Sequence, residues 1–281
     1  MFEVKHTIGS GGFGFVCKAS GADGRDYAIK SIPKVKNQSK NIAREVEAGL
    51  ILTHQNIGNY ITQYQDETNN YLAFEYIEGK FFIEFSDYDL TQLVGCDLFT
   101  FMDQRDLKGI SEMSARYIMK QLFSAVKYSH DNGVVHLDIK LENVMIQPSN
   151  GTVKLIDFGL CDFIKEDGSE LFARFDGSDD YLAAELIRNT NQPYSGTKVD
   201  VWCLGVVLFG LLSGSFPFNS YQRRVAMKGG RSHPGLTFTF KCSKKLKDLL
   251  TRMMDPNPKQ RITMSEILKH PWVKQKAKWD M

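Results

Sequence analysis

The sequence predicts an α+β fold in two parts, in which a small antiparallel, sheet-rich part is followed by a larger, mainly helical one. Short runs with strand-like alternation dominate residues 1–77 and are separated by glycine turns. From Ser111 onward, apolar residues recur instead at the spacing of amphipathic helices. The chain shows no internal repeat, low-complexity tract or long linker, and its length predicts one or two domains.

The first part is expected to be a sheet with one helix. Three strands are predicted in the runs FEVKHTIG, FGFVCKAS and RDYAIKSI, with glycine turns at Gly9–Gly14 and Gly21–Gly24. The stretch NIAREVEAGLIL carries apolar residues at helical spacing. NYITQYQDETNNYLAFEYIEG then predicts two strands joined by the polar turn Glu67–Asn70.

The second part is expected to be helical with one hairpin. A helix is predicted to begin after Ser111, a suitable N-cap, and to end just before Gly133. The turn Pro148–Gly151 joins two strand-like runs. The apolar run VDVWCLGVVLFGLLSG, from Val199, is predicted to be a core helix too short to span a membrane. A carboxylate buried at its start, Asp200, would need hydrogen-bond donors, which some backbone turn should supply.

Composition excludes several classes of protein. The chain has 281 residues and a formal net charge of +2, too little for the basic surface that nucleic-acid binding usually needs. Five scattered cysteines form no C-x-x-C pair, so we expect free thiols in a reducing compartment. The first residues, MFEVKHTIGS, show neither a signal segment nor a lipid-anchor motif. A cytoplasmic protein, or a nuclear one, without a membrane partner is therefore expected.

Gly9, Gly11 and Gly14 form a G-x-G-x-x-G pattern in the stretch IGSGGFGFV. They fall between two expected strands rather than between a strand and a helix, which disfavours a dinucleotide-binding fold. A structural hairpin is one interpretation. The better one is a flap whose backbone N–H groups reach a phosphate.

Lys30 ends the expected strand YAIK. A lone strand lysine is commonly a solvated edge residue, but an acidic partner would change its role. Glu45 or Glu47 on the next expected helix can pair with it and fix the ammonium group beside phosphates. Both partners stay open, although the spacing to the stretch HQNI favours Glu45.

The stretches HLDIKLEN and KLIDFG carry the residue types that phosphoryl transfer needs. Asp138 can accept a hydroxyl proton, and Lys140 can neutralise the moving phosphoryl group. Asn143 and Asp157 offer hard oxygen ligands for Mg²⁺. Each residue alone could be an ordinary turn residue, because Asp and Asn are common in turns, but turns do not explain the ordered set.

This ordered set resembles the eukaryotic protein kinase family over Phe2 to Val273. The resemblance implies the two-lobed protein kinase fold in one domain, with an N-lobe at 1–77 and a C-lobe at 78–281. Lysine two residues after Asp138 is typical of serine/threonine kinases. The stretches GSDDYLAAE, KVDVWCLGVVLFGLLSGSFPF and DPNPKQRITMSEILKHPWV most resemble the calcium/calmodulin-dependent and AMP-activated kinase group.

The resemblance implies transfer of the γ-phosphate of MgATP to serine and threonine hydroxyls of protein substrates. In the family pattern Lys30 holds the α and β phosphates, and Glu45 orients it. Asp138 is the catalytic base beside Lys140. The two magnesium ligands are Asn143 and Asp157.

A nucleotide pocket follows from the same resemblance. Phe74 is expected behind the adenine, and the Glu75 carbonyl and Ile77 amide at its polar edge. The full set expected around the nucleotide is Ile8, Gly9, Ser10, Gly11, Gly12, Phe13, Gly14, Val16, Ala28, Lys30, Phe74, Glu75, Ile77 and Met145.

The substrate side and the C-lobe also map onto the family pattern. Asp97 and Glu142 match positions that meet a substrate arginine, although a solvated surface charge is the alternative for both. Ser178 matches a further position on the substrate side. Glu185 is expected to pair with Arg261 and brace the C-lobe.

Two departures concern control of activity. Leu137 replaces an arginine that, in most relatives, grips a phosphorylated residue of the activation segment. Arg174 stands where the relatives' phosphorylated threonine would be. We therefore expect the segment to order without phosphorylation, with Arg174 pairing to a carboxylate such as Asp176 or Asp179.

Three departures concern packing. Ala184 replaces the proline of the usual A-P-E motif, which loosens a turn but removes no chemistry. Gly49 is expected to leave a packing gap and costs about 1 kcal/mol of helix propensity relative to alanine. A third departure is an apparent insertion at residues 80–94, which is a docking element, a tolerated surface loop or the product of a retained intron.

Two other functional classes share part of this sequence pattern. A pseudokinase scaffold would bind nucleotide or partners without transfer, with Leu137, Ala184 and Gly49 as signs of decay. A small-molecule phosphotransferase would lack GSDDYLAAE and the elements around Asp200 and Arg261. Every residue assigned to phosphate or metal contact is present, which favours the active kinase.

Overall fold

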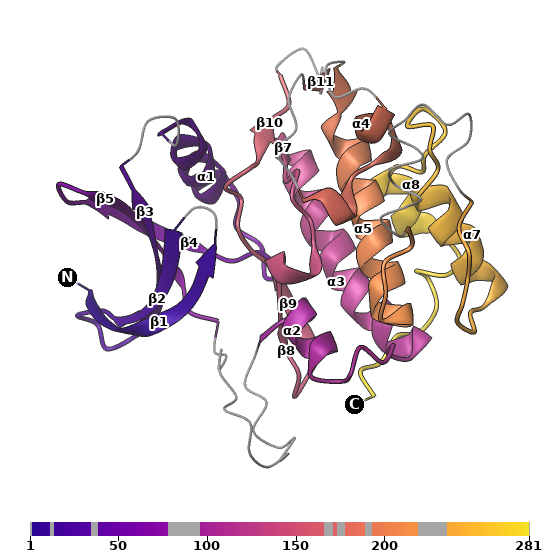
Figure 1. The fold of residues 1–281 in the computed structure, drawn as a ribbon, viewed down its shortest axis with the longest axis horizontal. Coiled ribbons are helices and arrows are strands. Elements are labelled where there is room, and N and C mark those ends of the chain that lie inside the picture. Colours follow the sequence, from indigo (N-terminus) through magenta and orange to yellow (C-terminus); the bar gives the residue numbers. More distant parts are fainter. Residues whose placement is uncertain are drawn as a thin grey trace.

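A sheet-rich lobe and a helical lobe lie side by side in the computed structural model (Figure 1). The structure describes residues 2–11, 14–34, 39–77, 96–165, 171–172, 178–188, 193–218 and 235–280. The predicted fold class is confirmed: the antiparallel sheet and one helix come first in the chain, and the mainly helical part follows. The expected insertion at 80–94, together with Gly12, Phe13, Arg174 and Asp176, lies outside the described residues.

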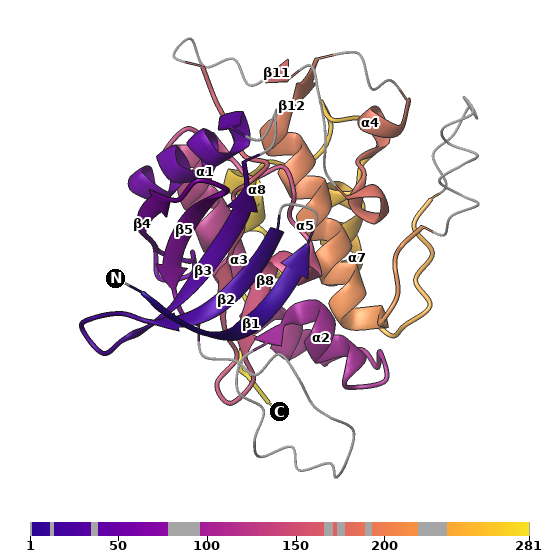
Figure 2. The same cartoon turned by 60° about the vertical axis from the view of Figure 1, so that its left-hand side comes forward.

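The first lobe is built on one antiparallel sheet with the strand order β1-β2-β3-β5-β4. Figure 2 shows β1, β2 and β3 next to one another, with helix α1 near them. The sheet and helix comprise β1 (Glu3–Gly11), β2 (Gly14–Ser20), β3 (Asp26–Pro33), α1 (Ser39–Ile51), β4 (Tyr60–Gln65) and β5 (Asn69–Glu75). All the expected strands and the helix are present, and β5 begins inside the predicted polar turn because Asn69 and Asn70 pair with β3 and β4.

The second lobe is dominated by α3 and α5, which cross its centre (Figure 1). Its helices are α2 (Leu98–Asp103), α3 (Glu112–Asp131), α4 (Ala184–Arg188), α5 (Gly196–Ser213), α7 (Lys244–Met253) and α8 (Met264–Lys269), with the 3-10 turns η2 (Leu141–Asn143) and η3 (Asp179–Tyr181). Its short strands are β6 (Cys96–Asp97), β7 (Val134–Val135), β8 (Val144–Gln147), β9 (Thr152–Leu155), β10 (Asp162–Phe163), β11 (Leu171–Phe172) and β12 (Tyr194–Ser195).

The predicted ends of α3 are confirmed. The Ser111 side chain accepts a hydrogen bond from the Ser114 N–H, which satisfies one of the free donors of the first turn. Gly133 follows the helix with φ +76°, a left-handed conformation that glycine adopts without strain. The predicted hairpin is also present, because β8 and β9 pair antiparallel across residues 148–151.

Helix α5 is the centre of the C-lobe core. Of the described helices it is the one long and apolar enough to cross a membrane by length and composition, so the expectation that the run is too short is wrong. Its 18 residues are 83% buried inside the fold, however, which makes it a core helix, as predicted. Its largest side chain, Trp202, is fully buried and stacks on Phe218 with ring centroids 5.8 Å apart.

A buried ion pair braces the C-lobe, as expected. The Arg261 guanidinium, 1% exposed, donates from Nη1 and Nη2 to the two oxygens of Glu185, at 2.8 and 2.6 Å. This two-point geometry is the strongest arrangement for such a pair. It joins the start of α4 to the segment before α8. Ala184, beside Glu185, is fully buried in the core.

The packing gap expected at Gly49 is not present. A Cβ added to Gly49 would lie 2.4 Å from Tyr60 Cβ and 2.8 Å from its Cγ, so the tyrosine already occupies the space. The Tyr60 ring also meets the Phe74 ring edge-on, with centroids 5.9 Å apart. Gly49 of α1 is therefore packed against a large side chain. The predicted cavity is wrong because Tyr60 of β4, outside the helix, fills the space.

Candidate functional site

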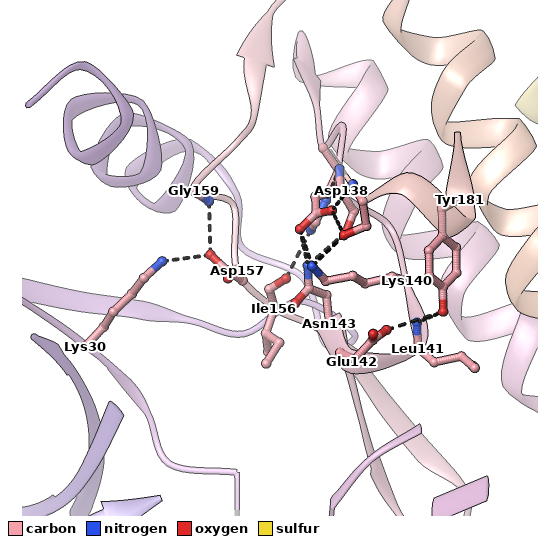
Figure 3. A network of polar contacts seen from close by, with 12 residues as sticks. Lys30, Asp138, Lys140, Leu141, Glu142, Asn143, Ile156, Asp157, Gly159 and Tyr181 are labelled. Atoms are coloured by element: carbon pink, nitrogen blue, oxygen red, sulfur yellow. Dashed lines mark hydrogen bonds and ion pairs between the residues drawn. The ribbon is translucent and has the colours of Figure 1, made fainter. Parts of the chain in front are cut away.

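Lys30 lies between the carboxylates of Glu45 and Asp157, and Figure 3 shows its contact with Asp157. Its ammonium Nζ donates to both oxygens of Glu45 at 2.8 Å and to Asp157 Oδ1 at 2.7 Å. The structure thereby resolves the two alternatives for the acidic partner: Lys30 pairs with Glu45 of α1. Three distant segments, β3, α1 and the chain after β9, meet in this one cluster.

The charges of this cluster shift the pKa values of Lys30 and Asp157. Burial would lower the pKa of Lys30, but the carboxylates of Glu45 and Asp157 outweigh burial and hold it above its ordinary value. Burial would likewise raise the pKa of Asp157, yet Lys30 beside it lowers that pKa below the usual range. Lys30 is therefore charged at neutral pH, and its positive charge lies at a fixed point.

A second cluster surrounds Asp138 (Figure 3). Its Oδ2 accepts from Lys140 Nζ at 2.8 Å and from Asn143 Nδ2 at 3.0 Å. Its Oδ1 accepts from the Ser178 hydroxyl at 3.0 Å, and Lys140 also donates to that hydroxyl at 2.9 Å. The structure thus brings together a carboxylate, a cation, an amide and a hydroxyl, all predicted site residues.

The backbone of the loop that carries Asp138, called the catalytic loop after the family pattern, is held by a buried carboxylate. Asp200, fully buried at the start of α5, accepts from the N–H groups of His136 at 2.9 Å and Leu137 at 2.8 Å. The expectation that Asp200 needs backbone donors is confirmed. His130 Nε2 lies 2.8 Å from the same carboxylate. Together these contacts support the positive φ of Leu137, +64°, which costs a non-glycine residue free energy.

His136 is a structural residue of the loop. Its Nδ1 accepts from the Asp138 N–H at 3.2 Å, and its Nε2–H donates to the Ile156 carbonyl at 3.1 Å. Both ring nitrogens are thus used in the neutral tautomer. The ring packs on Phe158, with centroids 4.6 Å apart, so the loop is joined to the segment that carries Asp157.

The glycine pattern forms the β1–β2 hairpin. Gly9 pairs with Val16, and Gly11 with Gly14. Gly14 has φ +133°, and a Cβ there would lie 1.9 Å from the Ser31 carbonyl oxygen, so only glycine fits. Ile8 is buried beside this hairpin. Backbone N–H groups in such a turn can meet a phosphate, as the sequence predicts.

The residues expected around adenine come from neighbouring strands. Val16 lies opposite Lys30, and Ala28 opposite Phe74, in the register of the sheet. Met145, 5% exposed, comes from β8 of the other lobe. Ile77 follows the last residues of β5, at the point where the chain leaves the first lobe. Their meeting around an adenine ring stays a prediction.

The Glu75 side chain has a role that the sequence did not predict. Its Oε1 accepts from Lys154 Nζ at 2.7 Å and from the Asn59 N–H at 2.8 Å. Lys154 lies on β9, so this ion pair joins the end of β5 to the C-lobe. A separation of 79 residues leaves no local signal by which the pair could be found.

The two predicted magnesium ligands suit a cation. Asn143 donates from Nδ2 to the Asp138 carbonyl at 2.8 Å and to its carboxylate, which leaves the amide oxygen for a metal. Asp157 uses Oδ1 for Lys30 and the Gly159 N–H, and Oδ2 can coordinate. Among the described residues no three His, Cys, Asp or Glu side chains form a metal cage. Mg²⁺ characteristically takes few protein ligands and completes its shell with phosphate and water.

The two acids predicted to meet substrate arginine lie in different environments. Asp97, 8% exposed, caps α2 by accepting from the Thr100 N–H at 2.8 Å and from its hydroxyl at 2.6 Å. This capping is an ordinary structural role. Glu142 is exposed, and its Oε2 accepts from the Tyr181 hydroxyl at 3.3 Å. Glu142 therefore offers the more accessible charge.

Tyr181 is a site residue that the sequence did not predict. Its hydroxyl accepts from the Leu141 N–H at 3.1 Å while donating to Glu142 (Figure 3). Burial raises the pKa of Tyr181 far above its ordinary value, so the hydroxyl keeps its proton. The residue ties the loop that carries Asp138 to the segment that carries Ser178.

The two-lobed fold and the two polar clusters are typical of the protein kinase class. The protein kinase domain family matches residues 2–273, and the chain belongs to this family. Among curated proteins, mouse sperm motility kinase 3A is 34% identical over 97% of this chain, and human NUAK family SNF1-like kinase 2 is 31% identical over 97%. A Dictyostelium discoideum protein described as probable serine/threonine-protein kinase MARK-C is 31% identical over 96%.

The match covers only part of each relative. The chain spans 50% of sperm motility kinase 3A, 40% of the human NUAK kinase and 33% of the MARK-C protein. The relatives agree with the predicted resemblance to serine/threonine kinases of the AMP-activated group.

Proposed function

We propose that this chain transfers the γ-phosphate of MgATP to serine and threonine hydroxyls of protein substrates. The observation that carries the proposal is the meeting of Asp138, Lys140, Asn143 and Ser178 within hydrogen-bond distance, beside the Lys30–Glu45–Asp157 cluster. MgATP, when bound, supplies the transferable phosphoryl group. The proposed setting is the cytoplasm or nucleus, where ATP is abundant and thiols stay reduced.

Asp138 is proposed as the base. A substrate hydroxyl at the position of the Ser178 hydroxyl would lie within about 3 Å of the Asp138 carboxylate, the distance that general-base catalysis needs. The Asn143 bond fixes the direction of that carboxylate. Lys140, which touches both Asp138 and Ser178, places a positive charge beside the reacting oxygen.

Lys30, Asn143 and Asp157 are proposed to hold the nucleotide. Lys30 would bind phosphate oxygens, since its ammonium is fixed in place by Glu45 rather than free in solvent. The Asn143 amide oxygen and the Asp157 carboxylate would hold Mg²⁺. The glycine hairpin at residues 9–14 and the apolar pair Val16 and Ala28 would cover the phosphates and the adenine.

Two finer features complete the proposal. A preference for substrates with upstream basic residues is supported by the exposed Glu142 and, less directly, by the capped Asp97. Activity without phosphorylation of the activation segment is supported by Leu137, which is apolar and buried in the core and so cannot bind a phosphate. The proposed pairing of Arg174 with Asp176 or Asp179 would stabilise the segment instead.

The test is transfer of radiolabelled phosphate from MgATP to a peptide library in which basic residues are varied. The protein is made in bacteria, treated with phosphatase, and compared with Asp138→Asn. Transfer by the wild type and its loss in the variant would establish the kinase. Equal transfer to peptides with and without upstream arginine would refute the proposed substrate preference. If transfer required prior phosphorylation by another kinase, the proposed activity without activation-segment phosphorylation would be refuted.

One outcome would favour the scaffold instead. If both proteins bind ATP, measured by a fluorescent nucleotide, but neither transfers phosphate to any peptide, the chain acts as a pseudokinase.

A further inference from the structure

Helix α1 has little fully buried apolar surface to hold it in place, although Ile42 and Val46 are half-buried. Of its described residues only Glu45 and Ala48 are buried, while Leu50 is 72% exposed and Ile51 40% exposed. Most helices in proteins owe their position to a packed apolar face. The position of α1, and with it that of Glu45, must therefore depend strongly on polar contacts.

One residue of α1 makes such contacts to the chain after Asp157. Arg44 Nη2 donates to Asp162 Oδ2 at 2.6 Å, and the two side chains are 24% and 25% exposed. At this depth an ion pair is screened by salt less than a pair on the open surface. Asp162 lies on β10, so the contact joins α1 to the other lobe near the site (Figure 1).

A neighbouring thiol holds the backbone of the same residue. The Cys161 Sγ–H donates to the Arg44 carbonyl at 3.6 Å, and Cys161 is fully buried. Burial raises the pKa of the Cys161 thiol, so it keeps the proton that it donates. The consecutive residues Cys161 and Asp162 thus contact the backbone and the side chain of Arg44, respectively.

Arg44 and Asp162 each neighbour residues of the proposed active site. Glu45, next to Arg44, holds Lys30 at 2.8 Å. Asp162 pairs in the β10–β7 ladder with Val135, the residue before His136 of the catalytic loop. The Arg44–Asp162 ion pair therefore connects the Lys30–Glu45–Asp157 cluster with the catalytic loop.

We propose that Arg44, Asp162 and Cys161 form a latch, here called the α1 latch, that positions Glu45 for its pair with Lys30. Arg44 and Asp162 are positioning residues, since they act on the reaction only through Glu45. The latch consists of unmodified side chains, so α1 is held in place without a phosphate group. Its kinetic consequence rests on the proposed kinase activity, but its structural consequence does not.

Cys161 supplies a probe that needs no catalysis. Labelling of Cys161 by iodoacetamide is followed by mass spectrometry in the wild type, Arg44→Ala, Asp162→Ala and the charge-exchanged R44D/D162R protein. We expect labelling in each single variant to be about 5- to 20-fold faster, as for loss of one charged hydrogen bond, and to return toward wild type in the exchanged protein. Lys40→Ala, an exposed cation on the same helix, is the matched control and should label as wild type.

A reference thiol distinguishes local opening from unfolding. Cys203 is buried in α5, remote in sequence from the latch, and should stay protected in all variants. Unchanged Cys161 labelling in both single variants would overturn the proposal. So would equal acceleration of Cys161 and Cys203, or an exchanged protein that labels no more slowly than the single variants.

Steady-state kinetics distinguish a displaced Lys30 from a smaller fraction of folded protein. A displaced Lys30 should raise the KM for ATP, whereas a smaller folded fraction would lower kcat with KM unchanged. We expect Arg44→Ala to raise the KM for ATP about 5- to 20-fold and R44D/D162R to restore it. An inactive wild type would refute the proposed function while leaving the labelling result to decide the latch.

Discussion

The two clusters of the site are held in place in different ways. The catalytic loop around Asp138 rests on Asp200, which is fully buried in the core helix of its own lobe. The Lys30 cluster instead joins three segments across two lobes, and its Glu45 is carried by a helix with few buried residues. Asp138, the proposed base, and its neighbours are therefore prearranged, whereas the position of Lys30, the proposed phosphate ligand, depends on how α1 is positioned.

The largest effect is expected at Asp200. Asp200→Ala leaves two buried N–H groups without an acceptor, which should lower the free energy of unfolding by about 3 kcal/mol. Phosphate transfer should fall about 100-fold or more, since the loop that carries Asp138 loses its support. Urea unfolding and peptide phosphorylation measure both.

A second His–Asp pair provides the control for that prediction. Asp248 lies 2.8 Å from His270, but its side chain is 60% exposed. Asp248→Ala should change stability by less than about 1 kcal/mol and leave transfer intact. If both variants lose stability equally, burial of Asp200 is not what holds the loop.

Lys30→Met should give the next largest effect, with a distinct dependence on pH. It leaves Glu45 and Asp157 buried without their cation, at an expected cost of about 3 kcal/mol near neutral pH. In the wild type the pKa of Asp157 is lowered by Lys30, so the stabilisation is present above the ordinary aspartate pKa and is lost as pH falls through the lowered value. The difference in unfolding free energy between wild type and variant should therefore shrink on acidification.

Urea unfolding at a series of pH values from 7 downward measures this difference. The exposed cation Lys40 of α1 again gives a matched control, because Lys40→Ala should show a small difference that does not vary with pH. A Lys30→Met deficit that stays constant or grows toward low pH would contradict the assigned ion pair.

A smaller effect is expected where α1 meets the sheet. Gly49→Ala would gain about 1 kcal/mol of helix propensity but would force a Cβ within 2.4 Å of Tyr60, an overpacking that costs about 1–3 kcal/mol. We expect a net loss of stability in thermal unfolding. Combining it with Tyr60→Ala should remove the clash, so the double variant should be more stable than additivity allows. Additive losses would mean that Tyr60 does not limit this position.

The smallest effect is expected at the end of β5. Lys154→Ala removes a partly exposed ion pair with Glu75, worth about 0.5–1 kcal/mol. The KM for ATP should rise less than about threefold if this pair helps to align the lobes. Lys127→Ala, which removes the Lys127–Asp131 pair within α3, should leave that KM unchanged. An effect of equal size in both variants would argue against alignment by Lys154.

Contacts between near neighbours were predicted most accurately. The cap at Ser111, the turn after Gln147 and the strands of the first lobe follow from hydrogen bonding and alternation within about ten residues. The acceptor role of Asp200 was also predictable, since a buried carboxylate must find donors. Its particular donors, 63 and 64 residues away, were reached only through the family resemblance.

Contacts between distant segments were predicted less well. Tyr60 fills the space beside Gly49, Tyr181 bonds the catalytic loop, and Lys154 holds Glu75, yet none of these pairs has a local pattern. The membrane-span length of α5 was also misjudged, and burial rather than length decides its role.

The amino-acid sequence alone shows which reactive side chains the chain carries and in what order. Residue types set proton affinity, charge and donor number, and these properties do not depend on the rest of the fold. Only the tertiary structure decided that Glu45 rather than Glu47 reaches Lys30, and that Arg44 meets Asp162. The reason is that an ion pair requires two charges within about 4 Å, and chain folding sets that distance both for Lys30 and Glu45, 15 positions apart, and for Arg44 and Asp162, 118 positions apart.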